Sequence, residues 1–213
     1  MKNMCGRFTF NGQQWPEFIP LEEQPEVEPN YNISPQEETC VIHLNSGLPE
    51  VKLMRWGLRP SWSKKSTMEP INARIETIDS KPMFRNAYRE RRCLIPASGW
   101  FEWKTTPRGK VPFYHRPLDD SLLLMAGIFE SSIDDGETLN SFSIITQEAI
   151  GEINHIHVRM PMLVSQQDAT MWLNGHLEAS KPPEIEVYPV GREVNKTTAT
   201  GRKLIQPLRT LFD

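Results

Sequence analysis

The chain has few cysteines and none of the spacings in which cysteines commonly act together. Cys5, Cys40 and Cys93 are odd in number and far apart, which favours reduced thiols in a cytosol-like compartment over a disulfide framework. Neither a C-x-x-C pair nor an H-E-x-x-H motif occurs. We therefore expect no metal ion, because structural and hydrolytic zinc sites use such spacings.

Long apolar runs are also lacking. No segment approaches the roughly 20 apolar residues that a membrane-spanning helix needs, and the first ten residues lack the apolar region of a secretory signal. We therefore expect a cytoplasmic protein without membrane contacts. The rest of the composition, with 38% hydrophobic and 24% charged residues in 213, is typical of a globular chain with a sizeable core.

Positive charge is absent from the first part of the chain and concentrated in the middle. Residues 8–51 contain eight carboxylates and no Lys or Arg, whereas residues 52–116 contain fifteen Lys or Arg and five Asp or Glu. Residues 117–191 contain twelve acids and two bases. A basic central third is typical of a phosphate-facing surface, but a solvated face that meets acidic neighbours explains it equally well.

Short apolar segments separated by Pro and Gly dominate the chain and indicate strands. They predict one α+β domain over residues 1–213, with an irregular and mainly antiparallel sheet system. The expected strands are Thr39–Leu44, Val51–Trp56, Cys93–Ile95, Gly99–Trp103, Val111–His115, Leu122–Phe129, Ser141–Thr146, Met162–Val164 and Val187–Val190.

Helices are expected to be few and peripheral. The segments with helix start signals are Pro82–Glu90, Gln147–Asn154 and Gln166–Leu173. The last of these follows Ser165, with Asp168 placed nearly as in a capping box, and Asn174-Gly175 would end it. The polar segment Asn195–Arg202 is expected to be a loose loop.

Cys5 lies close enough to the start to become the first residue of a processed chain. A terminal cysteine carries an α-amine and a thiol on adjacent carbons, and this pair condenses with an aldehyde to an imine and then to a thiazolidine. The α-amine has an ordinary pKa of about 7.7–8.0, so roughly a tenth of it is free base at neutral pH. Ring closure is intramolecular and needs no cofactor. Residues 1–4 would first have to be removed.

Residues 55–62 alternate tryptophans with arginines. Aromatic faces beside cations suit stacking on bases next to phosphates. Packing at the edge of a core is the competing interpretation. It is stronger for Trp56 than for Trp62, which lies in a Pro/Ser loop.

Two segments carry polar residues that packing does not require. The spacing i, i+2, i+4 puts Asn72, Arg74 and Glu76 on one strand face, although an ordinary exposed strand would look the same. Glu102 lies among three aromatic residues, and desolvation there would raise its pKa and suit it to proton transfer. A carboxylate that faces water beside an apolar strand is the alternative.

His157 and Arg159 are two residues apart and can share a face, one to move protons and one to hold an anion. A lone histidine is more often structural. Arg159 is more suggestive, because it is one of two bases in a long acidic region.

Taken together, these motifs resemble the SRAP (SOS response-associated peptidase) family, in the family's order and over nearly the whole chain. The matching segments are 5–8, 31–35, 55–58 with Trp62, 72–77, 83–85, 92–96, 99–103, 112–113, 126–127, 144–146, 157–161, 194–195 and 204–207. The resemblance implies a single SRAP domain with a barrel-like core.

The resemblance also implies a DNA-damage function: covalent trapping of the aldehyde of an abasic site in single-stranded DNA as a thiazolidine crosslink. Cys5 would be the nucleophile and Asn72 would position its amine or the sugar. Glu102 would relay protons, and His157 would assist sugar opening and the reverse reaction. The residues implied in DNA binding are Arg7, Trp62, Arg74 and Arg159. We expect a monomer that joins the nucleoid when bound to DNA.

Two positions depart from the family pattern. Family members usually begin Met-Cys, whereas here three residues precede Met4. We expect translation to start at Met4 and the methionine to be removed, with self-cleavage of a short leader as the other route. The position after the histidine is often Asp in the family and is Val158 here, which bears on crosslink reversal more than on trapping.

Other functions stay open at this point. A cysteine peptidase or amidohydrolase could use Cys5 with Glu102 and His157 as partners and would turn over repeatedly. A non-catalytic module could bind single-stranded DNA without an adduct. A structural protein with chance motifs is the last alternative.

Overall fold

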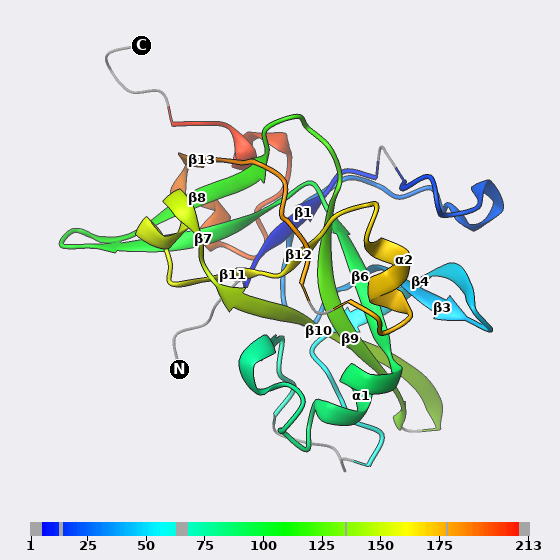
Figure 1. Ribbon diagram of the computed structural model, residues 1–213. Helices are drawn as coiled ribbons and strands as arrows, with labels where there is room; N and C mark the ends of the chain where they lie inside the picture. The colour runs from blue at the N-terminus through cyan, green and yellow to red at the C-terminus, as the bar shows by residue number, and fades with distance from the viewer. Residues whose placement is uncertain (1–5, 13–14, 63–67, 135, 178, 209–213) are drawn as a thin grey trace.

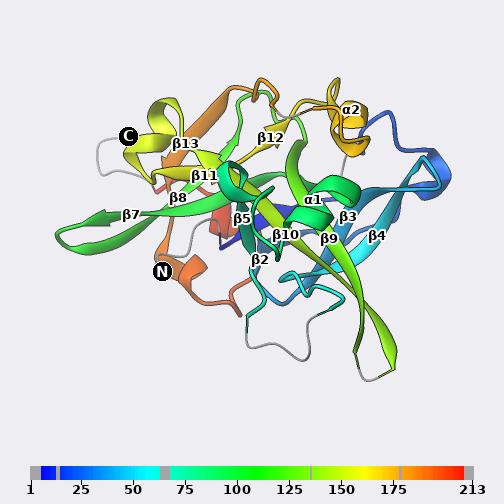
Figure 2. The same ribbon diagram turned by 60° about the horizontal axis from the view of Figure 1, so that its bottom comes forward.

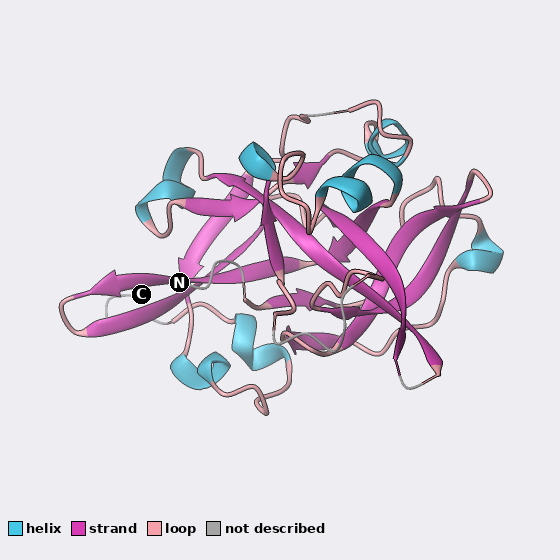
Figure 3. Cartoon of the chain, turned by 90° about the horizontal axis from the view of Figure 1, so that it is seen from below, coloured by secondary structure: helices cyan, strands magenta, loops and turns pink. Residues whose placement is uncertain are grey.

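The computed structural model describes residues 6–12, 15–62, 68–134, 136–177 and 179–208, and strands account for most of its regular structure (Figure 1). The helices are short and lie around the strands (Figure 3). Within these ranges, no helix is long and apolar enough to span a membrane.

Five strands close into a barrel. They are β3 (Glu38–Asn45), β4 (Leu48–Trp56), β6 (Arg92–Ala97), β9 (Leu123–Asp134) and β10 (Glu137–Glu148). Their order is β4-β3-β6-β9-β10, and a short parallel pairing of β10 with β4 completes the ring. The remaining pairings in the ring are antiparallel. The β3–β4 hairpin turns at Ser46-Gly47, where φ is positive at both residues as a two-residue hairpin loop requires.

Three short strands extend the barrel sheet: β5 (Asn72–Arg74), β11 (Arg159–Pro161) and β12 (Leu163–Val164). β5 runs parallel to β10, β11 runs antiparallel to β10, and β12 pairs with β9. The last residues of β10 therefore lie between β5 and β11.

A second, antiparallel sheet adjoins the barrel. It contains β1 (Phe8–Phe10), β2 (Asn30–Ile33), β7 (Gly99–Thr106), β8 (Gly109–Pro117) and β13 (Ile185–Pro189), in the order β13-β8-β7-β1-β2. β7 follows β6 after one residue, so the chain passes from the barrel into this sheet at Ser98. Gly99 is needed there, because a Cβ would collide with the carbonyl oxygen of His115 and the ring of Tyr114.

The sheet has different neighbours on its two faces. Trp100 belongs to the main core, which it shares with Phe8, Trp56 and Phe142. Phe101, the next residue of β7, belongs to a smaller cluster. Because side chains alternate along a strand, Glu102 lies on the same face as Trp100.

The helices are α1 (Arg85–Glu90) and α2 (Ala169–Leu173), with 3₁₀ helices η1 (Leu21–Glu23), η2 (Ile75–Thr77), η3 (Gly151–His155), η4 (Arg192–Asn195) and η5 (Arg202–Ile205). α1 and α2 fall inside two of the predicted helices but begin three residues later. Ser165 and Asp168 form the expected reciprocal pair: the Ser165 hydroxyl donates to Asp168, and the Asp168 amide donates to the Ser165 hydroxyl.

The predicted helix at Gln147–Asn154 is wrong. Gln147 and Glu148 continue β10, because their backbone groups pair with Met160 and Arg159 of β11. Only the 3₁₀ helix η3 follows.

The predicted loop at Asn195–Arg202 is present over residues 196–201, between η4 and η5, but it is anchored. The Asn32 amide donates to the carbonyl oxygens of Lys196 and Ala199 at 3.0 and 2.8 Å and holds this segment against β2.

The remaining fold predictions are confirmed: every predicted strand is present, and the fold is a single mainly stranded domain with a barrel.

Candidate active site and nucleic-acid interface

The chain enters its first strand beside Glu102. Cys5 lies outside the described residues, which begin at Gly6. Phe8 pairs with Trp100 across β1 and β7, and the Phe101 amide donates to the Arg7 carbonyl at 2.9 Å. The antiparallel alignment thus continues past the start of β1, and the next residues along it are Gly6 and Glu102.

Glu102 is buried, with 2% of its surface exposed. It lies opposite Phe113 on β8 and on the same face as Trp100, whose ring stacks on His115 at 4.6 Å between centroids. The alternative of a carboxylate that faces water is therefore wrong. Of its three aromatic neighbours in sequence, Trp100 shares this face, whereas Phe101 and Trp103 belong to the smaller cluster on the other face.

Asn72 and Arg74 lie at the end of β10. Asn72 pairs with Ile144 and Arg74 with Thr146 in the parallel β5–β10 ladder. They share a face, as the spacing predicts, with Asn72 half-buried and Arg74 exposed. The predicted third member, Glu76, is not on the strand, because the chain turns into η2 after Arg74.

Arg159 is held by Glu76. Its two terminal nitrogens donate to the two carboxylate oxygens of Glu76 at 2.5 and 2.9 Å, and Nη2 also donates to the carbonyl of Thr146 at 2.6 Å. The hydrogen bonds from Arg159 hold the pKa of Glu76 below its usual range, against the opposing effect of burial. The Arg159 guanidinium is therefore hydrogen-bonded to an internal carboxylate and to the backbone at the end of β10.

His157 precedes β11 and is half-buried. The Arg159 amide donates to its Nδ1 at 3.2 Å. The Arg159 carbonyl oxygen lies 3.3 Å from the same nitrogen, so the backbone at the start of β11 contacts Nδ1 in either tautomer. Val158 is exposed beside it.

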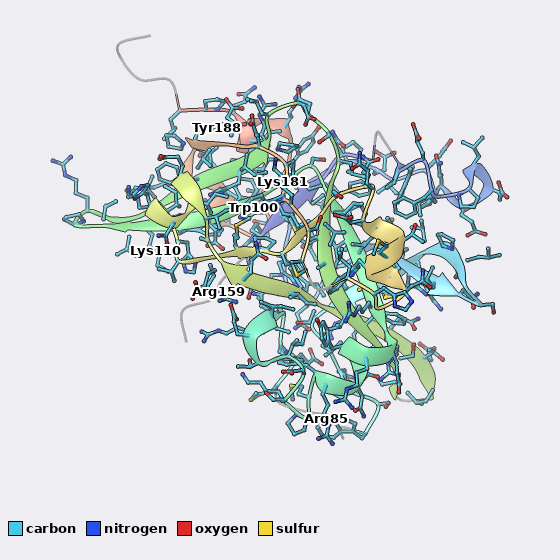
Figure 4. All side chains as sticks on the ribbon, in the orientation of Figure 1. Arg85, Trp100, Lys110, Arg159, Lys181 and Tyr188 are labelled. Atoms are coloured by element: carbon cyan, nitrogen blue, oxygen red, sulfur yellow. The ribbon has the colours of Figure 1, made fainter. Side chains whose placement is uncertain are left out.

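The segment η3–β11 lies along β7 and β8 in both views of the ribbon (Figures 1 and 2). Figure 4 labels Trp100 and Arg159 on these neighbouring elements. Backbone contacts define two groups of predicted residues: Arg7 and Glu102 lie on the aligned β1 and β7 segments, and the elements around the end of β10 carry Asn72, Arg74, His157 and Arg159.

Arg7 is half-buried and fixed in place. Its Nη1 donates to Asn32 at 3.1 Å, and Asn32 in turn holds the segment after η4. Burial lowers the pKa of Arg7, and the charge of Glu37 partly offsets this effect. Arg7 is thus a positioned cation one residue from the start of the described chain.

The segment 55–62 divides into a core part and an exposed part. Trp56 is completely buried, and its Nε1 donates to the Ile71 carbonyl at 2.9 Å, so the packing interpretation holds for it. Trp62 is 62% exposed, as a stacking surface requires.

Both arginines of this segment pair with Glu69. Arg55 and Arg59 donate to its two oxygens at 2.8 and 2.6 Å. Burial alone would raise the pKa of Glu69, but the hydrogen bonds from Arg59 and Arg55 outweigh it and lower that pKa. For Arg55 and Arg59, the interpretation of positive charges that meet acidic neighbours therefore holds, because both pair with Glu69.

Sequence reasoning missed Glu69 and Glu76 as arginine partners. Both acids lie in the basic central third, where few carboxylates occur, and that scarcity is the signal that could have identified them. Among the described residues, no group of three or more His, Cys, Asp or Glu could hold a metal ion.

Comparison with known proteins gives consistent results. The family model "SOS response associated peptidase (SRAP)" matches residues 4–197. The abasic site processing protein YoqW of Bacillus subtilis is 32% identical over 95% of this chain and 99% of its own length. YedK of Escherichia coli, with the same description, is 28% identical over 96% of this chain and 100% of its own. A crystal structure of a protein from Bacteroides thetaiotaomicron superposes with a TM-score of 0.81 at 25% identity, over 96% of this chain and all of that one.

Proposed function

The chain belongs to the SRAP family, and on that premise we propose that it processes abasic sites by trapping their aldehyde in single-stranded DNA. The relatives YoqW and YedK are both described as abasic site processing proteins and are matched over almost their whole length. The proposed reaction uses the α-amine and thiol of Cys5 once the residues before it are removed.

The proposed reaction balances without a cofactor. The amine adds to the aldehyde carbon of the ring-opened deoxyribose, and loss of one water gives an imine. The thiol then adds to the imine carbon and closes the thiazolidine. Protons must move to the departing oxygen and from the attacking nitrogen, which is the task we assign to Glu102. His157 would assist opening of the sugar and the reverse reaction, and Asn72 would orient the amine or the sugar.

One observation carries this proposal: the alignment of residues 6–8 with β7 ends beside a buried carboxylate. The Phe101 amide donates to the Arg7 carbonyl, and extending the Phe8–Trp100 register by two residues would put Gly6 opposite Glu102. A nucleophile on the residue before Gly6 is one peptide unit from that position. This supports a reaction at the chain terminus in which a buried acid takes part.

On the DNA side, we assign Arg7 and Arg74 to phosphates and Trp62 to stacking on a base. The expected role of Arg159 changes. Because its guanidinium is bound by Glu76 and Thr146, we propose that Arg159 positions η2 and the end of β10 rather than a phosphate.

A denaturing gel tests the proposal. Protein expressed from Met4 is mixed with an oligonucleotide that carries one abasic site, and we expect one slowly migrating adduct per protein molecule. The Cys5→Ala variant and an oligonucleotide whose aldehyde has been reduced to an alcohol should both give none. An adduct with Cys5→Ala would refute the proposal, and repeated hydrolysis of a protein substrate would favour the peptidase alternative.

A further inference from the structure

A cavity of about 370 Å³ opens on the barrel next to β2. Its floor is apolar and comes from Phe10, Ile33 and Cys40, which are buried, together with Val27 and Val51. At its mouth, Leu53 has 58% of its surface exposed. Leu53 and the apolar floor line the same cavity, so the exposed side chain and the floor belong to one apolar surface.

The rim of this cavity is acidic. Glu26, Glu28 and Glu38 line it and are exposed. The part of the chain that provides most of the lining, residues 8–51, has no Lys or Arg. Lys52 is adjacent in sequence, but strand alternation puts its side chain on the opposite face from Val51 and Leu53.

The cavity is separate from the candidate active site. Its lining residues come from β1, β2, β3, β4 and the segment 25–28, and none belongs to β5, β7, β10 or β11. Its charge is also opposite to what nucleic acid requires, because three carboxylates would repel phosphates.

We propose that this cavity binds a short segment of a partner protein, with one large apolar side chain inserted between Lys or Arg residues. The apolar floor would take the inserted side chain, and the carboxylates would face its basic flanks. Charge complementarity at a rim fixes orientation and speeds association, while a buried apolar anchor provides most of the affinity. This inference does not depend on the proposed reaction.

Fluorescence anisotropy with labelled peptides tests it. The probe has one central phenylalanine with two arginines on each side. One control peptide replaces the phenylalanine by serine, and the other replaces the arginines by glutamates. We expect the probe to bind at least tenfold more tightly than either control, with amide NMR shifts concentrated at Val27, Ile33 and Cys40.

Charge-reversal variants provide the matched control. The double variant Glu26→Lys/Glu28→Lys should weaken probe binding at least tenfold. The variant Glu22→Lys/Glu23→Lys changes net charge equally on η1, away from the lining, and should weaken it less than twofold. Both should keep the wild-type circular dichroism and adduct yield.

Three results would overturn the proposal. Equal loss in both double variants would mean a non-specific charge effect. Equal binding of the serine peptide would remove the apolar anchor. Concentration-dependent dimers in sedimentation, abolished by Glu26→Lys/Glu28→Lys, would show that a second copy of the chain occupies the cavity instead.

Discussion

Two regions of the molecule hold carboxylates in opposite ways. On β7, Glu102 is buried on the same face as Trp100, on a strand that pairs with β1. Around β4, β5 and β11, Glu69 and Glu76 are clamped by arginines and have lowered pKa values. An acid that an arginine keeps ionised is a poor proton shuttle near neutral pH, which argues against that role for Glu69 and Glu76.

Arginines that form internal ion pairs differ from residues that are exposed and can contact DNA. Arg55, Arg59 and Arg159 form ion pairs with internal carboxylates, although Arg159 was predicted to bind a phosphate. Arg74 and Trp62 are exposed. The predictions below test this division.

The largest expected effect comes from Glu102→Gln. If Glu102 moves protons, the first-order rate of adduct formation should fall about 10²–10⁴-fold, while the final yield at long times is unchanged. Quenched-flow single-turnover kinetics measure this rate. The control Glu76→Gln should lie within about threefold of wild type if its clamp is structural. Equal slowing by Glu102→Gln and Glu76→Gln would contradict a specific role of Glu102 in proton transfer.

Removing either partner of the Glu76–Arg159 ion pair should destabilise the fold, and removing Glu76 should cost more. Glu76→Ala leaves the Arg159 side chain, only 10% exposed, with an uncompensated charge, and we expect a loss of about 2–3 kcal/mol in the free energy of unfolding. Arg159→Met leaves Glu76, whose side chain is 44% exposed and can be hydrated, and should cost about 1 kcal/mol. Urea denaturation measures both values, and the reverse order would contradict the account.

Trp62→Ala should weaken binding to single-stranded DNA by about 1–2 kcal/mol, because one base would lose its stacking partner. Anisotropy with an intact, unmodified oligonucleotide measures the affinity without the covalent step. Leu48→Ala, another exposed apolar residue, lies at the β3–β4 turn and serves as the control. Similar losses in both variants would assign the effect to general hydrophobicity.

Arg74→Ala should change the salt dependence of the same binding. Loss of one phosphate contact lowers the slope of log K against log salt by about 0.7 for a single strand. Arg159→Met should leave the slope unchanged because its guanidinium is already paired. A lower slope of log K against log salt for Arg159→Met would show that Arg159 contacts a phosphate after all.

The smallest effect concerns acid stability. Because the pKa of Glu76 is lowered in the folded protein, its ion pair stabilises the fold above the unfolded pKa of about 4.3. This contribution is lost as the pH falls toward the folded pKa. The difference in unfolding free energy between wild type and Glu76→Gln should therefore shrink between about pH 6 and about pH 3. A constant difference would mean that charge is not its source.

Local patterns in the sequence explain what could be predicted. Apolar segments bounded by Pro and Gly identify the barrel strands, and the aromatic neighbours of Glu102 suggested its burial without excluding a carboxylate that faces water. Contacts between segments that are far apart in the sequence could not be predicted in the same way. Glu76 and Arg159 are 83 residues apart, and Gln147–Glu148 became strand instead of helix because β11 supplies partners for their backbone. Strands as short as β1 carry too little periodicity to be recognised.

Peptide mapping of the adduct by mass spectrometry tests the central claim most directly. After crosslinking to an abasic oligonucleotide, trypsin should release the oligonucleotide joined to Cys5-Gly6-Arg7, at the sum of the two masses less one water. An adduct on a lysine-containing peptide, or on a chain that still begins at Met1, would contradict the assignment of the aminothiol of Cys5 as the reacting group.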